Sequence, residues 1–357
     1  MKRFPHLVPV LGAAILLAAL CFIKPPGGSP ADVPIHRSDF LLNTFVDIAI
    51  YDSRDESILD GAMALCREYE NRFSRTLSGS EVYRLNHRED ATGTYPLSDD
   101  MTDLLATALY YCERSGGAFD ITTEPLSSLW NFSGTSPSVP PAEAIEEARC
   151  SCSCRAFWAA MCSRRKKVDY KKLRLDGTRS TLTFLDPGTS IDLGAIAKGY
   201  IADQLKAYLL DSGVESAMIN LGGNVLCVGS RPDGTPFTVG LQKPFADRNE
   251  TFAQVEVSDL SVVASGVYER HFVEDGKNYH HILDPSTGYP YDNGLISVTI
   301  LSERSVDGDA LSTTCFSLGL SRGMELVESM DGVYACFIDE DYQIHYSDGM
   351  EKFLRKD

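Results

Sequence analysis

The pattern of apolar and polar residues predicts two amphipathic helices in the first third of the chain. Over residues 56–73 apolar residues recur every three or four positions, with Ile58, Ala62, Leu65 and Tyr69 on one face. A second helix is predicted from a cap at Ser98 to about Arg114, because Gly116-Gly117 then stops it.

Short apolar runs bounded by turn residues predict strands. They cover residues 45–51, 190–193, 216–219, 224–228, 237–241, 262–272, 280–283 and 295–301, with a hairpin turn at Asp275-Gly276. Further helices are predicted over residues 195–210, 306–317 and 322–330, before a last hairpin over 333–346. Strands and helices are interleaved without strict alternation, and there is no internal repeat. We therefore expect an α+β fold with mixed sheets and flanking helices in one large domain.

Residues 1–30 have the layout of an export signal. Two basic residues precede an apolar run over residues 8–23, and a linker rich in proline and glycine follows. This run of sixteen residues would reach ~24 Å as a helix. It is shorter than the ~20 residues that a comfortable membrane span needs. Cys21 is a candidate for lipid attachment, although Leu20 stands where a lipoprotein signal has a small residue. A lipid anchor, a transmembrane anchor and a cleaved signal all stay open for residues 1–30. Residues 31–357 are expected to form an exported, membrane-associated domain.

The charge balance narrows the classes of partner. The chain has 357 residues, of which 43% are apolar and 23% charged, as in ordinary folded proteins. Its formal net charge of −17 repels polyanions, which argues against nucleic acid as a partner. A small phosphorylated ligand remains compatible with this charge, because a metal ion can reverse the local sign.

Apart from Cys21, the ten cysteines fall into two groups. Five lie singly among apolar neighbours and are predicted to be core residues, namely Cys66, Cys112, Cys227, Cys315 and Cys336. Four others, Cys150, Cys152, Cys154 and Cys162, lie close together in a segment over residues 137–172 that is predicted to be a surface insertion. The spacing of these four matches no standard zinc pattern, so metal binding, disulfides and free thiols all stay open.

Oxygen ligands for a magnesium ion are predicted at two places. Asp309 and Thr313 are four residues apart, so they share one face of a predicted helix near its start. Lys198 and the carbonyl of Ala195 lie where the strand predicted over 190–193 passes into a helix. Lys198 could contact a phosphate, and the Ala195 carbonyl could complete a magnesium shell. The alternative for both places is ordinary helix-start chemistry and close packing.

Two further segments carry candidate groups. His280 and His281 end a predicted strand and point to opposite sides of it, so the one that faces a cleft is a candidate general base, oriented by Asp284 and Thr287. Phe119-Asp120 follows a glycine-rich helix stop and could line a pocket for an aromatic ligand with a polar edge. The alternatives are a structural histidine and simple turn chemistry.

Seven motifs in a fixed order resemble the ApbE family, the FAD:protein FMN transferases. They are Phe73-Ser-Arg with Ser80-Glu-Val-Tyr-Arg-Leu-Asn, Gly117-Ala-Phe-Asp, Ile191-Asp-Leu-Gly-Ala-Ile-Ala-Lys-Gly-Tyr, Asn220-Leu-Gly-Gly-Asn, Ala264-Ser-Gly, His281-x5-Thr287-Gly288, and Asp309-Ala-Leu-Ser-Thr313. The resemblance spans nearly the whole chain after residue 30. It implies an ApbE-like fold and transfer of FMN from FAD to a threonine hydroxyl of an exported acceptor protein, with release of AMP.

The resemblance also implies a role for each candidate residue. Mg²⁺ would be held by Asp309, Thr313 and the Ala195 carbonyl together with the FAD pyrophosphate, and His281 would take the proton of the attacking hydroxyl. The positions that match FAD contacts are Ala118, Phe119, Asp120, Asp192, Lys198 and Leu283. Leu42 and Thr76 are assigned to the same site, where the family often has methionine and tyrosine, so flavin stacking is expected to differ.

The family further suggests that the acceptor is a subunit of a redox complex. Two other activities stay open. A magnesium-dependent FAD pyrophosphatase would use the same pocket but let water attack, and a non-catalytic flavin-binding protein would need no histidine base.

Overall fold

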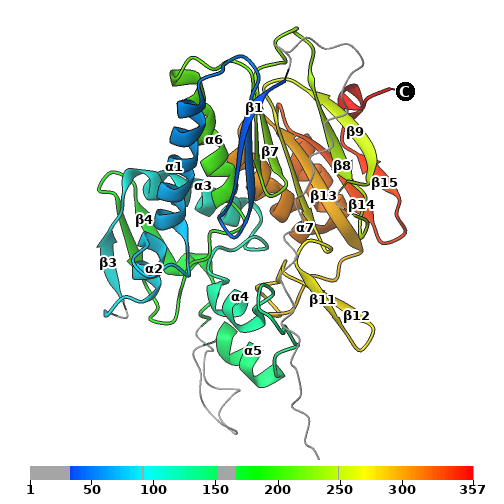
Figure 1. Ribbon diagram of the computed structural model, residues 1–357. Coiled ribbons are helices and arrows are strands. Elements are labelled where there is room, and N and C mark those ends of the chain that lie inside the picture. Colours follow the sequence, from blue (N-terminus) through cyan, green and yellow to red (C-terminus); the bar gives the residue numbers. More distant parts are fainter. Residues whose placement is uncertain (1–32, 91, 151–165, 248, 357) are drawn as a thin grey trace, which may run out of the picture. The chain divides into compact units, whose positions relative to one another are not determined.

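The computed structural model describes residues 33–90, 92–150, 166–247 and 249–356, and Pro34–Asp357 forms one compact unit (Figure 1). The predicted signal or anchor over residues 1–30 lies outside the described residues. Within the described ranges, no helix is long and apolar enough to cross a membrane.

An eight-stranded sheet is the centre of this unit. Its strands, in spatial order, are β1 (Ile35–Leu41), β2 (Thr44–Ile50), β6 (Ala217–Leu221), β7 (Asn224–Val228), β10 (Ser261–Gly266), β13 (Leu295–Ser302), β14 (Tyr334–Asp339) and β15 (Ile344–Tyr346). Every neighbouring pair in it is antiparallel. The predicted α+β class is confirmed, but the sheets formed by the described strands are antiparallel rather than mixed.

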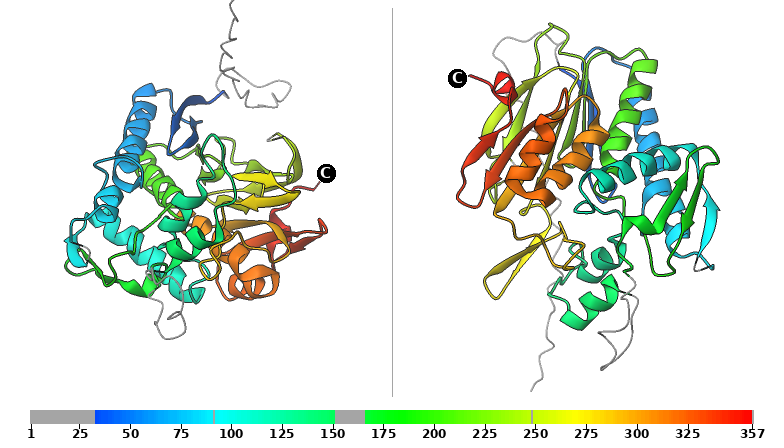
Figure 2. Two further views of the ribbon diagram at one scale, coloured as in Figure 1. Left: turned by 90° about the horizontal axis from the view of Figure 1, so that it is seen from below. Right: turned by 180° about the vertical axis from the view of Figure 1, so that it is seen from behind.

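Four long helices pack around the sheet and share its main core (Figures 1 and 2). They are α1 (Glu56–Phe73), α3 (Asp99–Arg114), α6 (Ala197–Asp211) and α7 (Ser305–Glu328), and they confirm the predicted helices. Ser98 caps α3 as predicted, because its hydroxyl accepts a hydrogen bond from the Met101 N–H at 3.3 Å. The two helices predicted over residues 306–330 are continuous in α7 except at Gly319, whose φ of 78° interrupts the helix.

Three small sheets and several short helices complete the described fold. The sheets are β3 (Gly93–Pro96) with β5 (Thr181–Phe184) and β4 (Leu173–Asp176), β8 (Phe237–Gln242) with β9 (Thr251–Val257), and β11 (His271–Glu274) with β12 (Lys277–His280). The short helices are α2 (Glu81–Asn86), α4 (Glu124–Trp130), α5 (Ala142–Arg149) and the 3₁₀ turns at Tyr170–Lys172 and Met350–Phe353. The predicted turn at Asp275-Gly276 joins β11 to β12, and both of its residues have positive φ.

Three strand predictions are wrong, and one of them is that over residues 280–283, of which only His280 lies in a strand, β12. Residues 190–193 form no strand, because Asn86 takes the place of a neighbouring strand: its side chain accepts from the Ile191 N–H and donates to the Ile191 carbonyl, both at 2.8 Å. The single strand predicted over residues 262–272 is divided into β10 and β11, which belong to different sheets.

The segment over residues 137–172, predicted to be a surface insertion, packs a few of its described residues into the fold. Ile145 on α5 is only 2% exposed, and with Val168 it packs against Trp130 of α4 and Leu283 in a small second core. The apolar residues were too sparse to reveal this burial. Cys150 is buried with a free thiol, whereas Cys152, Cys154 and Cys162 lie outside the described residues. The five single cysteines are buried, as predicted.

Candidate active site

The starts of α6 and α7 meet at very close range. A Cβ atom added at Gly199 would lie 2.3 Å from the Ser305 carbonyl oxygen, so only glycine permits this approach. Asp309, which is 4% exposed, accepts a hydrogen bond from the Gly199 N–H at 2.9 Å, and its other oxygen lies 3.3 Å from Lys198 Nζ. The structure therefore brings the predicted phosphate ligand and the predicted metal ligand into contact.

Thr313 lies one helical turn beyond Asp309. Its hydroxyl is 3.1 Å from the hydroxyl of Ser265 on β10, which is also 2.8 Å from that of Ser312. Ala195 lies two residues before the first residue of α6. No group of three or more His, Cys, Asp or Glu side chains that would hold a metal occurs among the described residues. Any ion here would rely on a carboxylate, a hydroxyl and a carbonyl, which are hard oxygen donors of the kind that Mg²⁺ prefers.

His281 follows β12 directly and carries an unpaired buried nitrogen. The backbone N–H of His281 donates to the Arg270 carbonyl at 3.1 Å, whereas Nδ1 of its ring is buried without a hydrogen-bond partner in the described protein. Burial, with the nearby charges of Arg270 and Lys198, lowers the pKa of His281 to about 3. The ring is thus neutral near pH 7, and it lies close enough to Lys198 for the charge of Lys198 to lower its pKa.

His280 is the structural member of the pair. Its Nε2 lies 2.9 Å from the Tyr291 carbonyl, and its Nδ1 accepts from the Ile282 N–H at 3.3 Å. Burial lowers the pKa of His280 to about 4. Both ring nitrogens are therefore occupied in the neutral form.

The prediction that Asp284 and Thr287 orient the catalytic histidine is wrong. The Asp284 carboxylate accepts from the backbone and hydroxyl of Ser286, and the Thr287 hydroxyl accepts from the Tyr289 N–H. These side chains stabilise the turn instead. Gly288 anchors it, with φ of 78° and a carbonyl that accepts from the Trp130 indole at 2.8 Å.

The segment after α3 is tightly bonded within the fold. The Asp120 carboxylate accepts from the Thr122 N–H and hydroxyl at 2.8 and 2.6 Å and from the Tyr170 N–H at 2.9 Å, while burial raises the pKa of Asp120. Turn chemistry, the alternative interpretation, accounts for this carboxylate. The Phe119 ring is buried in the main core rather than lining an open pocket, and the Ala118 carbonyl accepts from the Tyr291 hydroxyl. Leu283 is likewise buried, in the second core.

Arg75 is a residue that the sequence analysis did not assign. Its Nε lies 3.3 Å from Asp192, and its Nη1 donates to the Ser128 hydroxyl at 2.8 Å and lies 3.7 Å from Glu124. It thus joins the loop after α1, the start of α4 and the predicted FAD contact Asp192. The motif Phe73-Ser-Arg contained this signal, but nothing in the sequence indicated its partners.

Leu42 and Thr76 both lie near the C-terminal end of α1. The Leu42 N–H, in the β1–β2 turn, donates to Glu70 in the last turn of α1 at 2.8 Å. Thr76 follows that helix by three residues, and its N–H donates to the Ser74 hydroxyl. Neither residue has a hydrogen bond to the other predicted site residues in the described structure.

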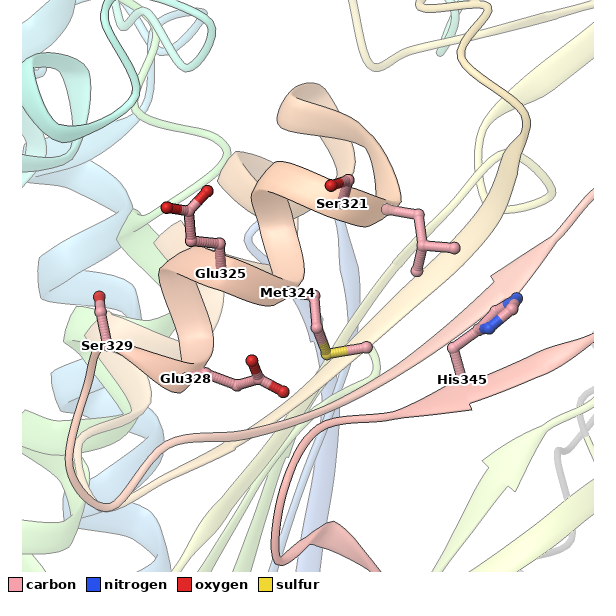
Figure 3. Close-up of a pocket in the computed structure, with 7 residues that line it drawn as sticks. Ser321, Met324, Glu325, Glu328, Ser329 and His345 are labelled. Atoms are coloured by element: carbon pink, nitrogen blue, oxygen red, sulfur yellow. The ribbon is translucent and has the colours of Figure 1, made fainter.

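Two surface hollows lie away from these residues. One, of about 700 Å³, lies between the second half of α7 and His345 on β15; Met324 and Glu328 are among its lining residues (Figure 3). Another, of about 370 Å³, is lined by residues of α3 and of the segment around Tyr170. Neither contains a predicted site residue. The contact of Lys198 with Asp309, with the His281 ring near enough to Lys198 for the charge of Lys198 to lower its pKa, marks the candidate site.

Residues 42–338 match the model of the ApbE family. The chain belongs to this family. The resemblance seen in the seven motifs is thereby confirmed, and the match includes every candidate site residue.

Similar proteins have a consistent description. The FAD:protein FMN transferase of Klebsiella pneumoniae is 35% identical over 309 residues, covering 86% of this chain and 90% of that protein. That of Treponema pallidum is 31% identical over 355 residues, covering 96% and 94%. Among solved structures, the ApbE protein of Thermotoga maritima has a TM-score of 0.78 at 30% identity, covering 90% of this chain and all of that one. The flavin transferase ApbE of Vibrio cholerae has a TM-score of 0.76 at 26% identity, covering 90% and 99%.

Proposed function

We propose that this protein transfers FMN from FAD to a hydroxyl group of an acceptor protein and releases AMP. Membership of the ApbE family and the FAD:protein FMN transferases that it resembles support the reaction class. The observation that carries the proposal is the contact of Lys198 with Asp309 at the starts of α6 and α7, together with the unpaired Nδ1 of His281, whose ring is near enough to Lys198 for the charge of Lys198 to lower its pKa.

A magnesium ion fits the oxygen donors of this site. Asp309, Thr313 and the Ala195 carbonyl would hold it, and it would supply positive charge to the FAD pyrophosphate. Lys198 already lies beside Asp309, so it would meet the same phosphates. This local positive charge offsets the net charge of −17 that the chain as a whole presents to an anionic substrate.

His281 would act as general base. The acceptor hydroxyl oxygen forms a new bond to the FMN phosphorus, its proton moves to the free ring nitrogen of His281, and the bond from that phosphorus to the AMP oxygen breaks. The low pKa keeps the ring neutral and able to accept the proton. The phosphates of bound FAD would raise this pKa by adding negative charge next to the ring.

The remaining expectations concern binding and location. The segment Ala118–Asp120 with Asp192 and Leu283 would contact FAD, and Leu42 and Thr76 would border the flavin. An acceptor threonine in a subunit of a redox complex, and a place on the outer face of the cell membrane, are supported by the family resemblance and by the signal-like residues 1–30.

The test is the mass of the acceptor. The full chain is incubated with FAD, Mg²⁺ and an acceptor domain that contains the target threonine, and intact mass spectrometry should find a gain of one FMN. EDTA or His281→Ala should abolish the gain, whereas His345→Ala, remote from the site, should not. Release of AMP without labelling in the presence of acceptor would contradict transfer and indicate a pyrophosphatase, and FAD binding without any AMP would indicate a flavin-binding protein.

A further inference from the structure

The start of α7 has no capping side chain of its own. Its N-cap residue, Arg304, makes no capping hydrogen bond, although the first backbone N–H groups of any helix need acceptors. Asp203 on α6 supplies them. One carboxylate oxygen accepts from the Ser305 N–H at 2.8 Å and the other from the Val306 N–H at 2.9 Å.

The start of α6 is capped in return by α7. Its N-cap residue, Ile196, makes no capping bond either, and the Gly199 N–H in the first turn donates to Asp309 instead. Each helix therefore lends a carboxylate to the other. A displacement of the first turn of α7 would move Asp309, because Ser305 and Asp309 are one turn apart.

A buried polar network fixes the same turn to the sheet. The Ser305 hydroxyl donates to the Asn224 side chain on β7 at 2.7 Å and accepts from the Ser261 hydroxyl on β10 at 2.9 Å. All three side chains are buried. Asn224 ends the motif Asn220-Leu-Gly-Gly-Asn, so at least this residue of the motif has a role in holding the helix start.

We infer that Asp203 is a positioning residue for the metal site: by capping α7 from α6, it holds Asp309 and Thr313 where a divalent cation is to bind. The inference rests on the proposed function, since it assumes that these two residues ligate the ion. Asp203 bonds to the backbone of α7 and acts only through it, so it is not itself a catalytic residue.

The test compares Asp203→Asn with Asp211→Asn, a matched control at the exposed end of the same helix. An amide offers one oxygen and one NH₂ group to two N–H donors, so it caps only one of them. Affinity for Mn²⁺, measured on the full chain by electron paramagnetic resonance, should fall roughly tenfold or more in Asp203→Asn and stay unchanged in the control. Hydrogen exchange should become faster at both Gly199 and Ser305, since the two caps are coupled.

A purely stabilising role for Asp203 would lower the melting temperature while leaving Mn²⁺ affinity at the parent value, and this result would overturn the inference. The inference would also be overturned if the parent chain binds no Mn²⁺. If Asp203→Asn does not fold, Asp203→Glu keeps the carboxylate but displaces it, and undiminished Mn²⁺ affinity in that variant would count against the inference equally. Labelling of the acceptor by the parent chain tests the proposed function separately, so failure of the inference can be told apart from failure of the proposed function.

Discussion

At the scale of single residues, two adjacent histidines differ in how their ring nitrogens are used. Both nitrogens of His280 have partners in the neutral ring, whereas Nδ1 of His281 has none among the described residues. Strand alternation predicted that the two histidines point to opposite sides but not which of them faces the site; only the family resemblance assigned that role to His281. The Tyr291 carbonyl, which occupies Nε2 of His280, comes from another segment of the fold.

His280 should make the protein less stable in acid. Its folded pKa of about 4 lies below the ordinary value of 6.5, so between these pH values the unfolded chain binds a proton that the folded chain does not. Stability is therefore lost as the pH falls through this window, by about 3 kcal/mol from this residue. Urea unfolding at several pH values should give a shallower decline for His280→Gln, and an identical decline in parent and variant would contradict the prediction.

Thr314 offers a gain in stability beside the proposed metal site. Its hydroxyl is fully buried and has no partner in the described structure, whereas the neighbouring Thr313 hydroxyl bonds to Ser265. Thr314→Val keeps the shape and removes the unsatisfied group, so the free energy of unfolding should rise by about 1 kcal/mol. Thr313→Val should instead weaken Mn²⁺ binding. Chemical denaturation and metal titration of both variants measure the contrast, and a destabilised Thr314→Val would refute it.

At the scale of elements, the site depends on the contact between α6 and α7. The hydrophobic periodicity predicted both helices and placed Asp309 and Thr313 on one face of α7. It did not predict that the two helix starts would touch. That contact depends on Gly199 and on caps that each helix takes from the other.

A methyl group at Gly199 should separate the two helices. Since its Cβ would lie 2.3 Å from the Ser305 carbonyl, the backbone must shift, and Gly199→Ala should cost about 1–3 kcal/mol of stability in spite of alanine's better helix propensity. Metal affinity should fall as well. Gly177→Ala, where a Cβ would meet nothing within 4 Å, is the control. Equal thermal stability and equal Mn²⁺ affinity in the two variants would show that the close contact does not matter.

At the scale of the whole molecule, the net charge of the chain and the charge of its substrate FAD are both negative. The chain has 50 acidic and 33 basic residues, and FAD is an anion. Binding must therefore work against a repulsive field, except where Lys198 and the cation proposed above would reverse it.

Salt should therefore affect FAD binding differently with and without magnesium. In EDTA, raising the ionic strength screens the repulsion, so affinity for FAD measured by flavin fluorescence should increase. With saturating Mg²⁺ the affinity should be higher and depend less on salt. A metal-free protein that binds FAD equally well at all salt concentrations would contradict this prediction.

The sequence alone determined the long helices, most of the central strands, the buried single cysteines and the family. These follow from periodicity and from ordered motifs, which are local signals. Only the tertiary structure decided which groups meet: Lys198 with Asp309, 111 residues apart, Asp203 with Ser305, 102 apart, and Arg75 with Asp192. It also decided that Ile145 of α5 is buried and that the Asp284 side chain stabilises a turn. Such contacts depend on how closely distant backbones approach, and no pattern within one segment carries that information.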